Sequence, residues 1–287
     1  MTLIIILIAL SLDFFLGGLE RFRNFNWCIS LYYGLEKRLA QYKFWDGTFG
    51  LLIVLSVALS GLLIVLYLTC SLPWFVEIVI SLVVLIYCLA PEDLDNRLDE
   101  YITAVDEDNV GAATELAGGL IDETLLSEND SDEIAIIKSS LVESHKRTFG
   151  VIFWFLILGA VGALLYRLVN QINDEFSEVR SGFADSNSIL MNILEWPSSR
   201  LMVLGLALAG HLVDALPGWS KAEHLSFAVN DQVLTNAGIG ALQYRSDVVV
   251  PEREKSYWID ELKSLLNRTL IIWLAILGIM TLSGTLG

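Results

Sequence analysis

Several long, uninterrupted runs of apolar residues restrict this chain to folds that are stable inside a lipid bilayer. A helix of roughly 17 to 25 apolar residues crosses about 30 Å of hydrocarbon. Four segments have this length, namely 48–70, 73–90, 150–169 and 269–286. The alternation typical of a strand occurs only in "DVVVPE" near Val248. We therefore predict an all-α, polytopic helical membrane protein whose first partner is the bilayer.

Two weaker segments add to these four. Segment 2–16 is short and interrupted by Asp13, and no basic residue or small-residue cleavage site marks it as a signal peptide. We interpret it as a retained anchor. Segment 201–216 carries His211 and Asp214, so it is either a sixth span lined with polar groups or a helix at the membrane interface.

The distribution of basic residues predicts an orientation. Segments 20–46, 91–148 and 217–268 hold 15 of the 18 Lys and Arg residues. With six spans, the positive-inside rule places these three segments in the cytoplasm and both termini outside. Segment 170–199 would then lie on the periplasmic side.

We predict a single membrane domain over residues 1–287 that contains two polar segments. Segment 91–148 is predicted to be a cytoplasmic helical insertion, and 217–268 is a second polar segment. Apolar residues recur at helical spacing on both sides of "DEDNVG", which predicts a helical hairpin. A third helix is expected to start at Asp130 or Ser131 and to continue into the membrane near Phe149.

Composition and motifs exclude several common functions. The net charge of −16 argues against nucleic acid as a partner. The three cysteines show no CxxC spacing, and "PEDLDNRLDE" lacks the glycine and regular oxygen spacing of a calcium loop, so we predict no metal site. No phosphate-binding, dinucleotide, HExxH or GxSxG motif is present, and no cofactor is indicated.

A polar cluster, "YRLVNQIND", follows the span 150–169. If that span is one straight helix, Arg147 and Arg167 are about 30 Å apart on opposite sides of the membrane. Gly159 and Gly162 allow a re-entrant hairpin instead, which would bring Lys146, Arg147, Tyr166 and Arg167 together. Arg167, Asn170 and Asp174 share one helical face, as in a polar patch, but a snorkelling arginine at a solvated helix end gives the same pattern.

Two further groups of polar residues are candidate sites. Glu143, His145, Lys146 and Arg147 combine a carboxylate, an imidazole and two cations, which suits a phosphate or carboxylate ligand with proton transfer by Glu143 or His145. The alternative is a positive-inside anchor at a helix end. His211 and Asp214 are either an intramembrane proton-carrying or ligand-binding pair, or a structural hydrogen bond between helices.

The segment "LVESHKRTFGVIFWFLILGAVGALLYRLVNQ" resembles the central part of the AmpE family, membrane proteins associated with β-lactamase induction. "YITAVDEDNVGAATELAG", "ILEWPSSRLMVLGLALAGH", "QVLTNAG" and the C-terminal span add to the resemblance, which covers the chain from about residue 90 onward. The AmpE resemblance implies a non-enzymatic modulator in the bacterial inner membrane. Such a protein would sense cell-wall status, with a cytoplasmic AmpD-like amidase as a partner.

AmpE proteins are similar in turn to the CobD or CbiB membrane enzymes of cobalamin biosynthesis, which join an aminopropanol-type amine to a corrinoid carboxylate. The matching positions here are Glu143 and Ser144, Phe153 and Trp154, Tyr166, Arg167, Asn170 and Asn173 or Asp174, and Trp196 and Arg200. After Glu143 the chain reads "SHKRTFG" where those enzymes are rich in asparagine, and "NAGIGAL" is shorter than their counterpart.

Three functions stay open at this point. The first is the AmpE-like modulator. The second is a ligase-like enzyme related to the corrinoid amide synthases, with Glu143 and His145 as catalytic residues beside Arg167. The third is a small-solute transporter, for which only His211 and Asp214 offer intramembrane charge.

Overall fold

The computed structural model describes residues 2–16, 25–42, 45–69, 71, 73–89, 91–127, 130–219, 229–244 and 256–283. Over these ranges every regular element is helical, which confirms the all-α prediction. The contacts divide the chain into two compact units. Unit 1 comprises Met1–Ala90 and Gly150–Glu195, and unit 2 comprises Pro91–Phe149 and Trp196–Gly287. These are units of packing, and the single membrane domain over 1–287 stays a prediction.

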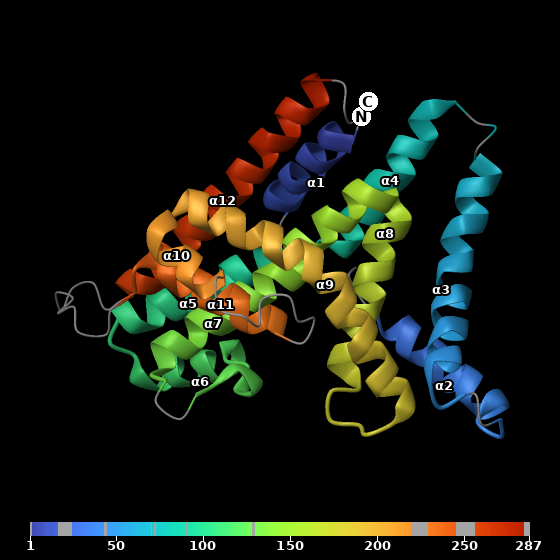
Figure 1. Cartoon of the computed structure of the whole chain (residues 1–287), viewed down its shortest axis with the longest axis horizontal. Helices are drawn as coiled ribbons and strands as arrows, with labels where there is room; N and C mark the ends of the chain where they lie inside the picture. Colours follow the sequence, from blue (N-terminus) through green and yellow to red (C-terminus); the bar gives the residue numbers. More distant parts are fainter. Residues whose placement is uncertain are drawn as a thin grey trace. The chain divides into compact units, whose positions relative to one another are not determined.

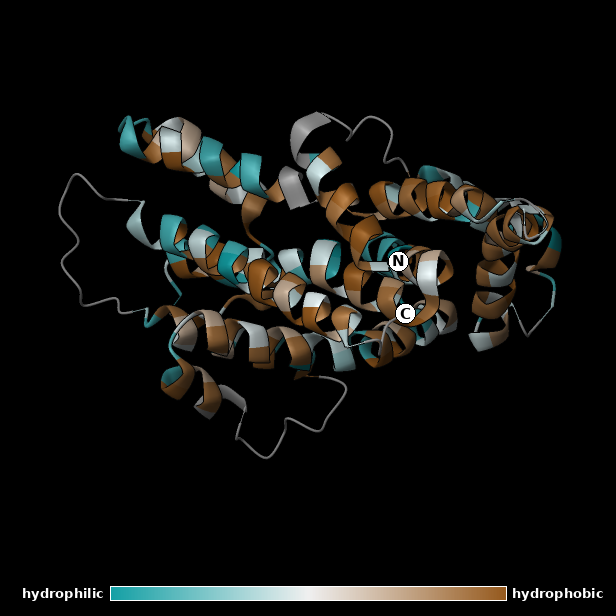
Figure 2. Ribbon diagram, turned by 90° about the horizontal axis from the view of Figure 1, so that it is seen from above, coloured by the Kyte–Doolittle hydropathy of each residue, from teal (hydrophilic) through white to brown (hydrophobic). Residues whose placement is uncertain are grey.

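Apolar helices of membrane-spanning length confirm the multi-pass prediction. Within the described ranges, three helical stretches are long and apolar enough to cross a bilayer, and two more are apolar but shorter. The three are Thr48–Thr69, Asp132–Glu175 and Tyr257–Leu282, and the two are Thr2–Asp13 and Trp74–Cys88. Figure 2 shows several helices coloured as hydrophobic over most of their length.

Unit 1 begins with four helices, of which the first, third and fourth follow predicted apolar runs and the second lies in the predicted polar segment 20–46. They are α1 (Thr2–Leu16), α2 (Asn26–Leu39), α3 (Thr48–Thr69) and α4 (Trp74–Cys88). The unit is completed by α8 (Gly150–Glu175) and the first part of α9 (Gly182–Ala209). Cys28 and Cys88 are buried in this unit, whereas Cys70 lies outside the described residues.

Helix α8 reverses its direction at Gly159. The backbone of Gly159 has φ 63° and ψ −149°, a combination that is essentially restricted to glycine. A Cβ on Gly150 would lie 2.4 Å from the ring of Tyr166, although a straight helix would separate residues 150 and 166 by about 24 Å. A Cβ on Gly162 would likewise meet the carbonyl oxygen of Trp154 at 2.3 Å. The single straight helix is therefore wrong, and α8 is a helical hairpin that turns at Gly159 (Figure 1), whereas its re-entrance into a membrane stays a prediction.

This reversal also corrects the predicted orientation of the polar segments. The backbone N–H of Phe183 donates to Oδ1 of Asp46 at 2.9 Å, and the hydroxyls of Thr48 and Ser186 are 3.1 Å apart. A Cβ on Gly182 would also meet the carbonyl oxygen of Asp46. The start of α9 thus lies at the same end of α3 as Asp46. These contacts do not fit the prediction that segments 20–46 and 170–199 lie on opposite sides of the membrane, because Asp46 and Gly182 are direct neighbours.

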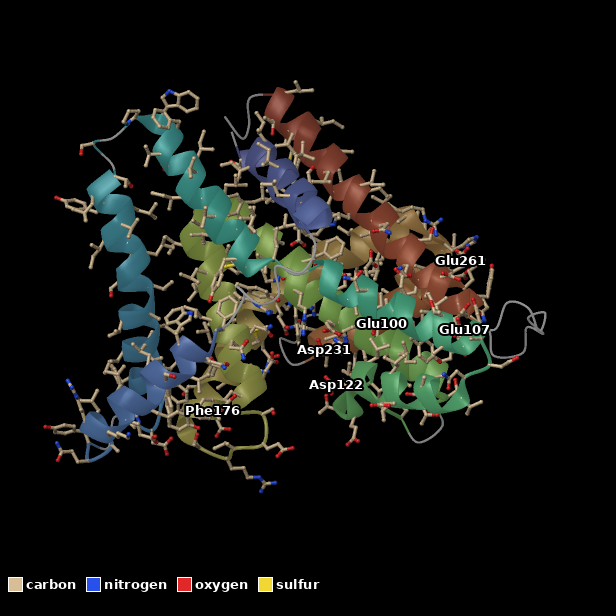
Figure 3. The ribbon with its side chains drawn as sticks, turned by 180° about the vertical axis from the view of Figure 1, so that it is seen from behind. Glu100, Glu107, Asp122, Phe176, Asp231 and Glu261 are labelled. Carbon is tan, nitrogen blue, oxygen red and sulfur yellow. The ribbon has the colours of Figure 1, made fainter. Side chains whose placement is uncertain are left out.

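Unit 2 contains the predicted insertion. Helices α5 (Pro91–Asp106) and α6 (Val110–Leu120) form the expected hairpin, which is followed by η2 (Glu123–Leu125) and α7 (Asp132–Ser144). Ser131 caps α7 as predicted, since its Oγ accepts from the N–H of Ile134. Figure 3 shows acidic residues of the insertion, among them Glu100, Glu107 and Asp122, and all three are exposed.

The rest of unit 2 comes from the C-terminal third of the chain. It holds the end of α9, α10 (Leu212–Trp219), α11 (Asn230–Leu242) and α12 (Tyr257–Leu282). Within the predicted segment 217–268, the structure describes residues 217–219, 229–244 and 256–268. The strand-like "DVVVPE" lies outside the described residues. The described part includes α11, which packs against α7 and α10.

Segment 201–216 is not one continuous helix. Helix α9 ends at Ala209 and α10 starts at Leu212, because the backbone at Gly210 packs against α11. A Cβ on Gly210 would lie 2.5 Å from the carbonyl oxygen of Ala241, which accepts from the N–H of His211 at 3.0 Å. The segment is thus divided between two helices and does not form a sixth continuous span.

We predict that Gly159→Ala destabilises the fold while Gly61→Ala does not. An added Cβ meets no atom within 4 Å at either position, and only Gly159 has a positive φ. The strained φ should lower the free energy of unfolding by about 1–3 kcal/mol, whereas alanine inside α3 should raise it by about 0.5–1 kcal/mol. Unfolding by SDS titration in mixed micelles measures both changes. Equal effects of the two substitutions would contradict the reversal.

Candidate functional site

The carboxylate of Glu143 lies between two arginines in unit 2. Nη1 of Arg97 and Nη2 of Arg147 each lie 2.9 Å from the same oxygen, Oε1 of Glu143. Arg97 also donates through Nη2 to the carbonyl oxygen of Gly119. The side chains are 31%, 28% and 18% exposed for Arg97, Arg147 and Glu143. This cluster, which we call the Arg97–Glu143–Arg147 cluster, is thus within reach of a ligand and carries one net positive charge.

A π-helical segment shapes this part of the chain. Residues His145–Phe149 (η3) form one π-helical turn between α7 and α8. Such turns are rare and frequently occur at functional sites. Glu143 and Arg147 flank His145 on this stretch, and their ion pair has i, i+4 spacing.

The imidazole of His145 is buried against a serine. Its Nε2 lies 2.9 Å from Oγ of Ser198 on α9, and the two residues are 1% and 0% exposed. A hydroxyl at hydrogen-bond distance from an imidazole is also the geometry of an activated nucleophile. Because both groups are enclosed, the hydrogen bond here joins η3 to α9 rather than facing a substrate.

Arg200 is held by several groups of unit 2. It is 7% exposed, and its Nη1 donates to Oγ of Ser199 at 2.9 Å and to Oδ1 of Asn230. Its guanidinium carbon lies 5.4 Å from the ring centroid of Trp196, a cation–π distance. Trp196 and Arg200, paired in sequence by the "EWPSSR" motif, are therefore in contact.

The remaining motif residues lie in unit 1. Tyr166 is fully buried against Gly150, and the guanidinium of Arg167 stacks over the ring of Phe25 at 5.3 Å from its centroid. Asn170 is 2% exposed, whereas Asp174 is exposed. The predicted face of α8 therefore runs from a half-buried arginine and a buried asparagine to a solvated aspartate.

A second asparagine, which sequence reasoning missed, lies beside this face. Asn187 on α9 is 1% exposed and donates through Nδ2 to the carbonyl oxygen of Val169 at 3.1 Å. The Oδ1 atoms of Asn170 and Asn187 are both buried without a hydrogen-bond partner among the described residues. Two buried acceptors of this kind need a donor, such as water or a ligand N–H or O–H.

The structure brings together some predicted groups and separates others by unit. Unit 2 contains Glu143 at the end of α7 and His145, Lys146 and Arg147 in η3. It also contains Trp196 and Arg200. Tyr166, Arg167, Asn170 and Asp174 belong to unit 1. A shared pocket for Arg147 and Arg167 stays a prediction.

His211 and Asp214 form the predicted pair. Nδ1 of His211 lies 3.1 Å from Oδ2 of Asp214, which also accepts from Nε2 of Gln243 at 2.6 Å. The side chains of His211 and Asp214 are 55% and 49% exposed. Because Gln243 directly follows α11, the arrangement matches the structural alternative, a polar link between neighbouring helices.

The acidic run on α5 makes ion pairs within the protein. The carboxylate of Asp99 pairs with Nζ of Lys263, and burial raises the pKa of Asp95. No group of three or more His, Cys, Asp or Glu side chains suited to a metal ion occurs among the described residues.

Arg97 is a residue of the candidate site that sequence reasoning passed over. It stands inside "PEDLDNRLDE", which reads as a solvated acidic face, and its partner Glu143 lies 46 positions away. Its single positive charge in an acidic run was the available signal. Ser198, Asn187 and Asn230 carried no comparable signal, because neutral polar residues are common at helix surfaces.

The sequence comparisons agree with the second part of the resemblance. The profile of the CobD/Cbib protein family matches residues 6–245, which is most of the chain. The chain belongs to this family. The match includes α8, η3 and the "EWPSSR" motif, so it covers every residue of the site described above.

Two curated relatives carry the same description. The chain is 26% identical over 170 residues to the "Cobalamin biosynthesis protein CobD" of Chromobacterium violaceum, covering 58% of this chain and 54% of the relative. It is 31% identical over 115 residues to the protein of that name from Stutzerimonas stutzeri, covering 38% and 37%. The chain thus spans about half the length of the first relative and less of the second. No solved structure matches the chain.

These findings overturn the first functional hypothesis. The prediction of a modulator of β-lactamase induction is wrong, because the family profile and both relatives point to cobalamin biosynthesis proteins. The wider CobD/CbiB relationship is confirmed.

We predict that Ser198→Ala lowers the free energy of unfolding by about 1–3 kcal/mol, because it removes the partner of a buried imidazole nitrogen. Ser264→Ala on the exposed side of α12 is the matched control and should change stability by less than about 0.5 kcal/mol. SDS titration in mixed micelles compares the two variants. A neutral Ser198→Ala would show that the hydrogen bond to His145 is dispensable.

Proposed function

We propose that this protein is a membrane-bound enzyme that forms an amide bond between an amine and a corrinoid carboxylate. The observation that carries the proposal is the family match over residues 6–245. The names of both relatives, cobalamin biosynthesis protein CobD, support the same pathway. The bacterial inner membrane is the proposed location.

The Arg97–Glu143–Arg147 cluster supports this chemistry. Two guanidiniums against one carboxylate leave a positive charge that suits a substrate carboxylate or phosphate. The planar guanidinium binds such groups through two parallel N–H donors. Glu143 would hold both guanidiniums in place until the substrate anion competes for them.

Glu143 is also the better placed of the two predicted proton-transfer residues. When an amine attacks an activated carboxylate, a C–N bond forms, the activating group leaves, and the nitrogen must lose a proton. Glu143 is 18% exposed and can receive that proton, whereas His145 is enclosed with Ser198. We therefore propose Glu143 as the base and His145 as a positioning residue for η3.

Three further predictions concern the motif residues of unit 1, a protein partner and the transporter hypothesis. Arg167, Asn170 and Asp174 would contribute to substrate binding through the family motif that they match. An AmpD-like amidase as a partner belonged to the modulator hypothesis and stays an untested prediction. The exposed, structurally bonded pair His211 and Asp214 gives no support to a transporter.

We predict that Arg97→Met lowers kcat/KM for amide formation at least about tenfold, because one charged hydrogen-bonding partner of the substrate anion is lost. The matched control is Arg268→Met. Arg268 also pairs with a glutamate of unit 2, Glu261, but both residues lie on α12 and outside the Arg97–Glu143–Arg147 cluster. Purified protein is supplied with a corrinoid carboxylate, aminopropanol or its phosphate, and Mg-ATP, and the product is detected by mass spectrometry.

The assay tests the proposed reaction and the proposed role of the Arg97–Glu143–Arg147 cluster separately. A wild-type protein that neither binds the corrinoid nor yields an amide would refute the proposed reaction. An active wild type with an unaffected Arg97→Met variant would retain the reaction and remove the Arg97–Glu143–Arg147 cluster from it.

A further inference from the structure

The chain passes between the two units at three junctions, and each junction coincides with an irregularity in the helices. The junctions lie between residues 90 and 91, 149 and 150, and 195 and 196. At the first, α4 ends at Cys88, and Leu89 is extended with φ −77° and ψ 145° before α5 begins. Helix α4 therefore does not continue into α5 as one regular helix.

The second junction directly follows a π-helical turn. Phe149 is the last residue of η3, and Gly150 is the first residue of α8. A π-helical turn widens the helix locally, because its backbone hydrogen bonds join residues i and i+5. Such turns are among the few causes of a sharp kink in a helix. The second junction is therefore a place where the helix axis can change direction.

The third junction lies beside a proline inside α9. Pro197 has no N–H to donate to the carbonyl of Ile193, and its ring crowds that carbonyl. The hydroxyl of Ser199 donates to the carbonyl oxygen of Trp196 at 3.1 Å, a bond of the kind that often bends a helix. Two separate features thus weaken the regular helix at the same point of α9.

Two hydrogen bonds, which we call the flanking bonds, link the second junction to the third, one on each side. In unit 1, Nε1 of Trp154 on α8 donates to the carbonyl oxygen of Leu194 on α9 at 3.0 Å. In unit 2, Nε2 of His145 lies 2.9 Å from Oγ of Ser198. Along the chain, the rest of η3 and Pro197 lie between the flanking bonds. The second and third junctions are therefore coupled and must bend together.

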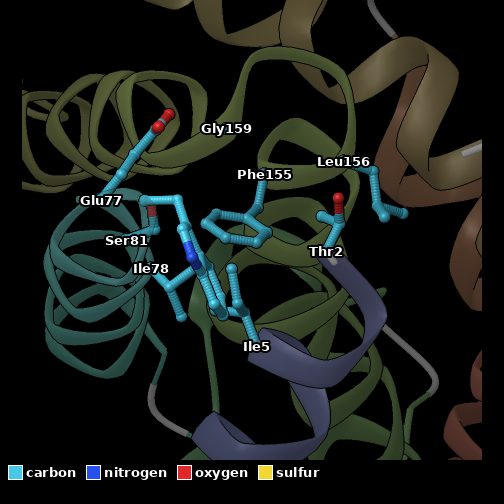
Figure 4. Close-up of a pocket in the computed structure, with 9 residues that line it drawn as sticks. Thr2, Ile5, Glu77, Ile78, Ser81, Phe155, Leu156 and Gly159 are labelled. Carbon is cyan, nitrogen blue, oxygen red and sulfur yellow. The ribbon is translucent and has the colours of Figure 1, made fainter. Parts of the chain in front are cut away.

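Both flanking bonds belong to well-packed parts of their units. Phe155, which follows Trp154, is 2% exposed. Figure 4 shows it in the wall of a cavity that Ile5 on α1 and Ile78 on α4 also line. The two residues of the flanking bond in unit 2 are 1% and 0% exposed. Bending is thereby confined to the short stretches between the flanking bonds.

We propose that the three junctions form a hinge about which unit 1 and unit 2 reorient. Residues at the ends of helices absorb large changes in backbone angles at a hinge, while the packed bodies on either side keep their structure. Motif residues such as Arg147 in unit 2 and Arg167 in unit 1 move with their units. The motion belongs to the protein itself and does not depend on the reaction proposed above.

Double electron–electron resonance between pairs of spin labels measures this motion. The full-length protein is placed in nanodiscs after its three cysteines are replaced by alanine. Labels at exposed helical positions report between the units through Ser188→Cys with Thr114→Cys. Control pairs lie within unit 1, at Ser30 and Ser188, and within unit 2, at Thr114 and Ser264. The between-unit distance distribution should be at least about twice as wide as either control, because a hinge displaces whole units.

A second measurement stiffens one junction. Pro197→Ala restores the missing N–H and should narrow the between-unit distribution by at least about a third, because the third junction becomes regular helix. The matched control is Pro73→Ala, since Pro73 is an exposed proline that precedes α4 in unit 1 and lies away from the junctions. It should leave the width unchanged.

A third measurement removes one flanking bond. Trp154→Phe keeps an aromatic ring but loses the indole N–H, so the two coupled junctions can bend independently and the between-unit distribution should widen. The matched control is Trp258→Phe, because Trp258 is a buried tryptophan of α12 away from the junctions. This control should behave like the wild type.

The proposal is overturned if the wild-type distribution between the units is as narrow as the two within-unit controls. It is also overturned if Pro197→Ala and Trp154→Phe both leave the between-unit width unchanged. A variant that alters the within-unit distances is misfolded, in which case the other variant decides, and the wild-type comparison decides if both are misfolded.

Discussion

The close packing of Gly150 against the ring of Tyr166 is the contact on which unit 1 depends. It is possible only because Gly159 adopts a backbone conformation that residues with a Cβ avoid. The reversal turns an apolar run of spanning length into a helical hairpin, which returns the chain to the end of α3 near Asp46. Within unit 1 it thereby places the start of α9 beside Asp46.

In unit 2 the corresponding constraint is electrostatic. Glu143 receives two guanidiniums on one oxygen, and removing any member would leave the others without compensation in a partly desolvated place. The π-helical turn His145–Phe149 follows Glu143 directly, and the hydrogen bond between His145 and Ser198 ties this turn to α9. A structural link and a ligand-accessible cluster thus occur side by side on one short stretch of chain.

"LLYRLVNQ" and "EWPSSR" carried real information, since the CobD/Cbib profile covers both. The family profile and both relatives favour the CobD/CbiB reading over the AmpE-like modulator. Motif residues such as Arg167 and Arg200 report shared ancestry and geometry, whereas function depends on the groups around them. For Arg200 those groups are Ser199, Asn230 and Trp196, and for Arg167 the ring of Phe25.

The sequence by itself determined the helical class, the apolar helices, the hairpin of α5 and α6 and the cap at Ser131, because periodicity and capping are local properties. It also offered the glycines at 159 and 162 as a place for a break. The tertiary structure decided that the break occurs at Gly159, that segment 170–187 returns to the side of Asp46, and that Arg97 meets Glu143. The physical reason is that these outcomes depend on contacts between residues far apart in the chain. Hydropathy and local spacing carry no information about such contacts.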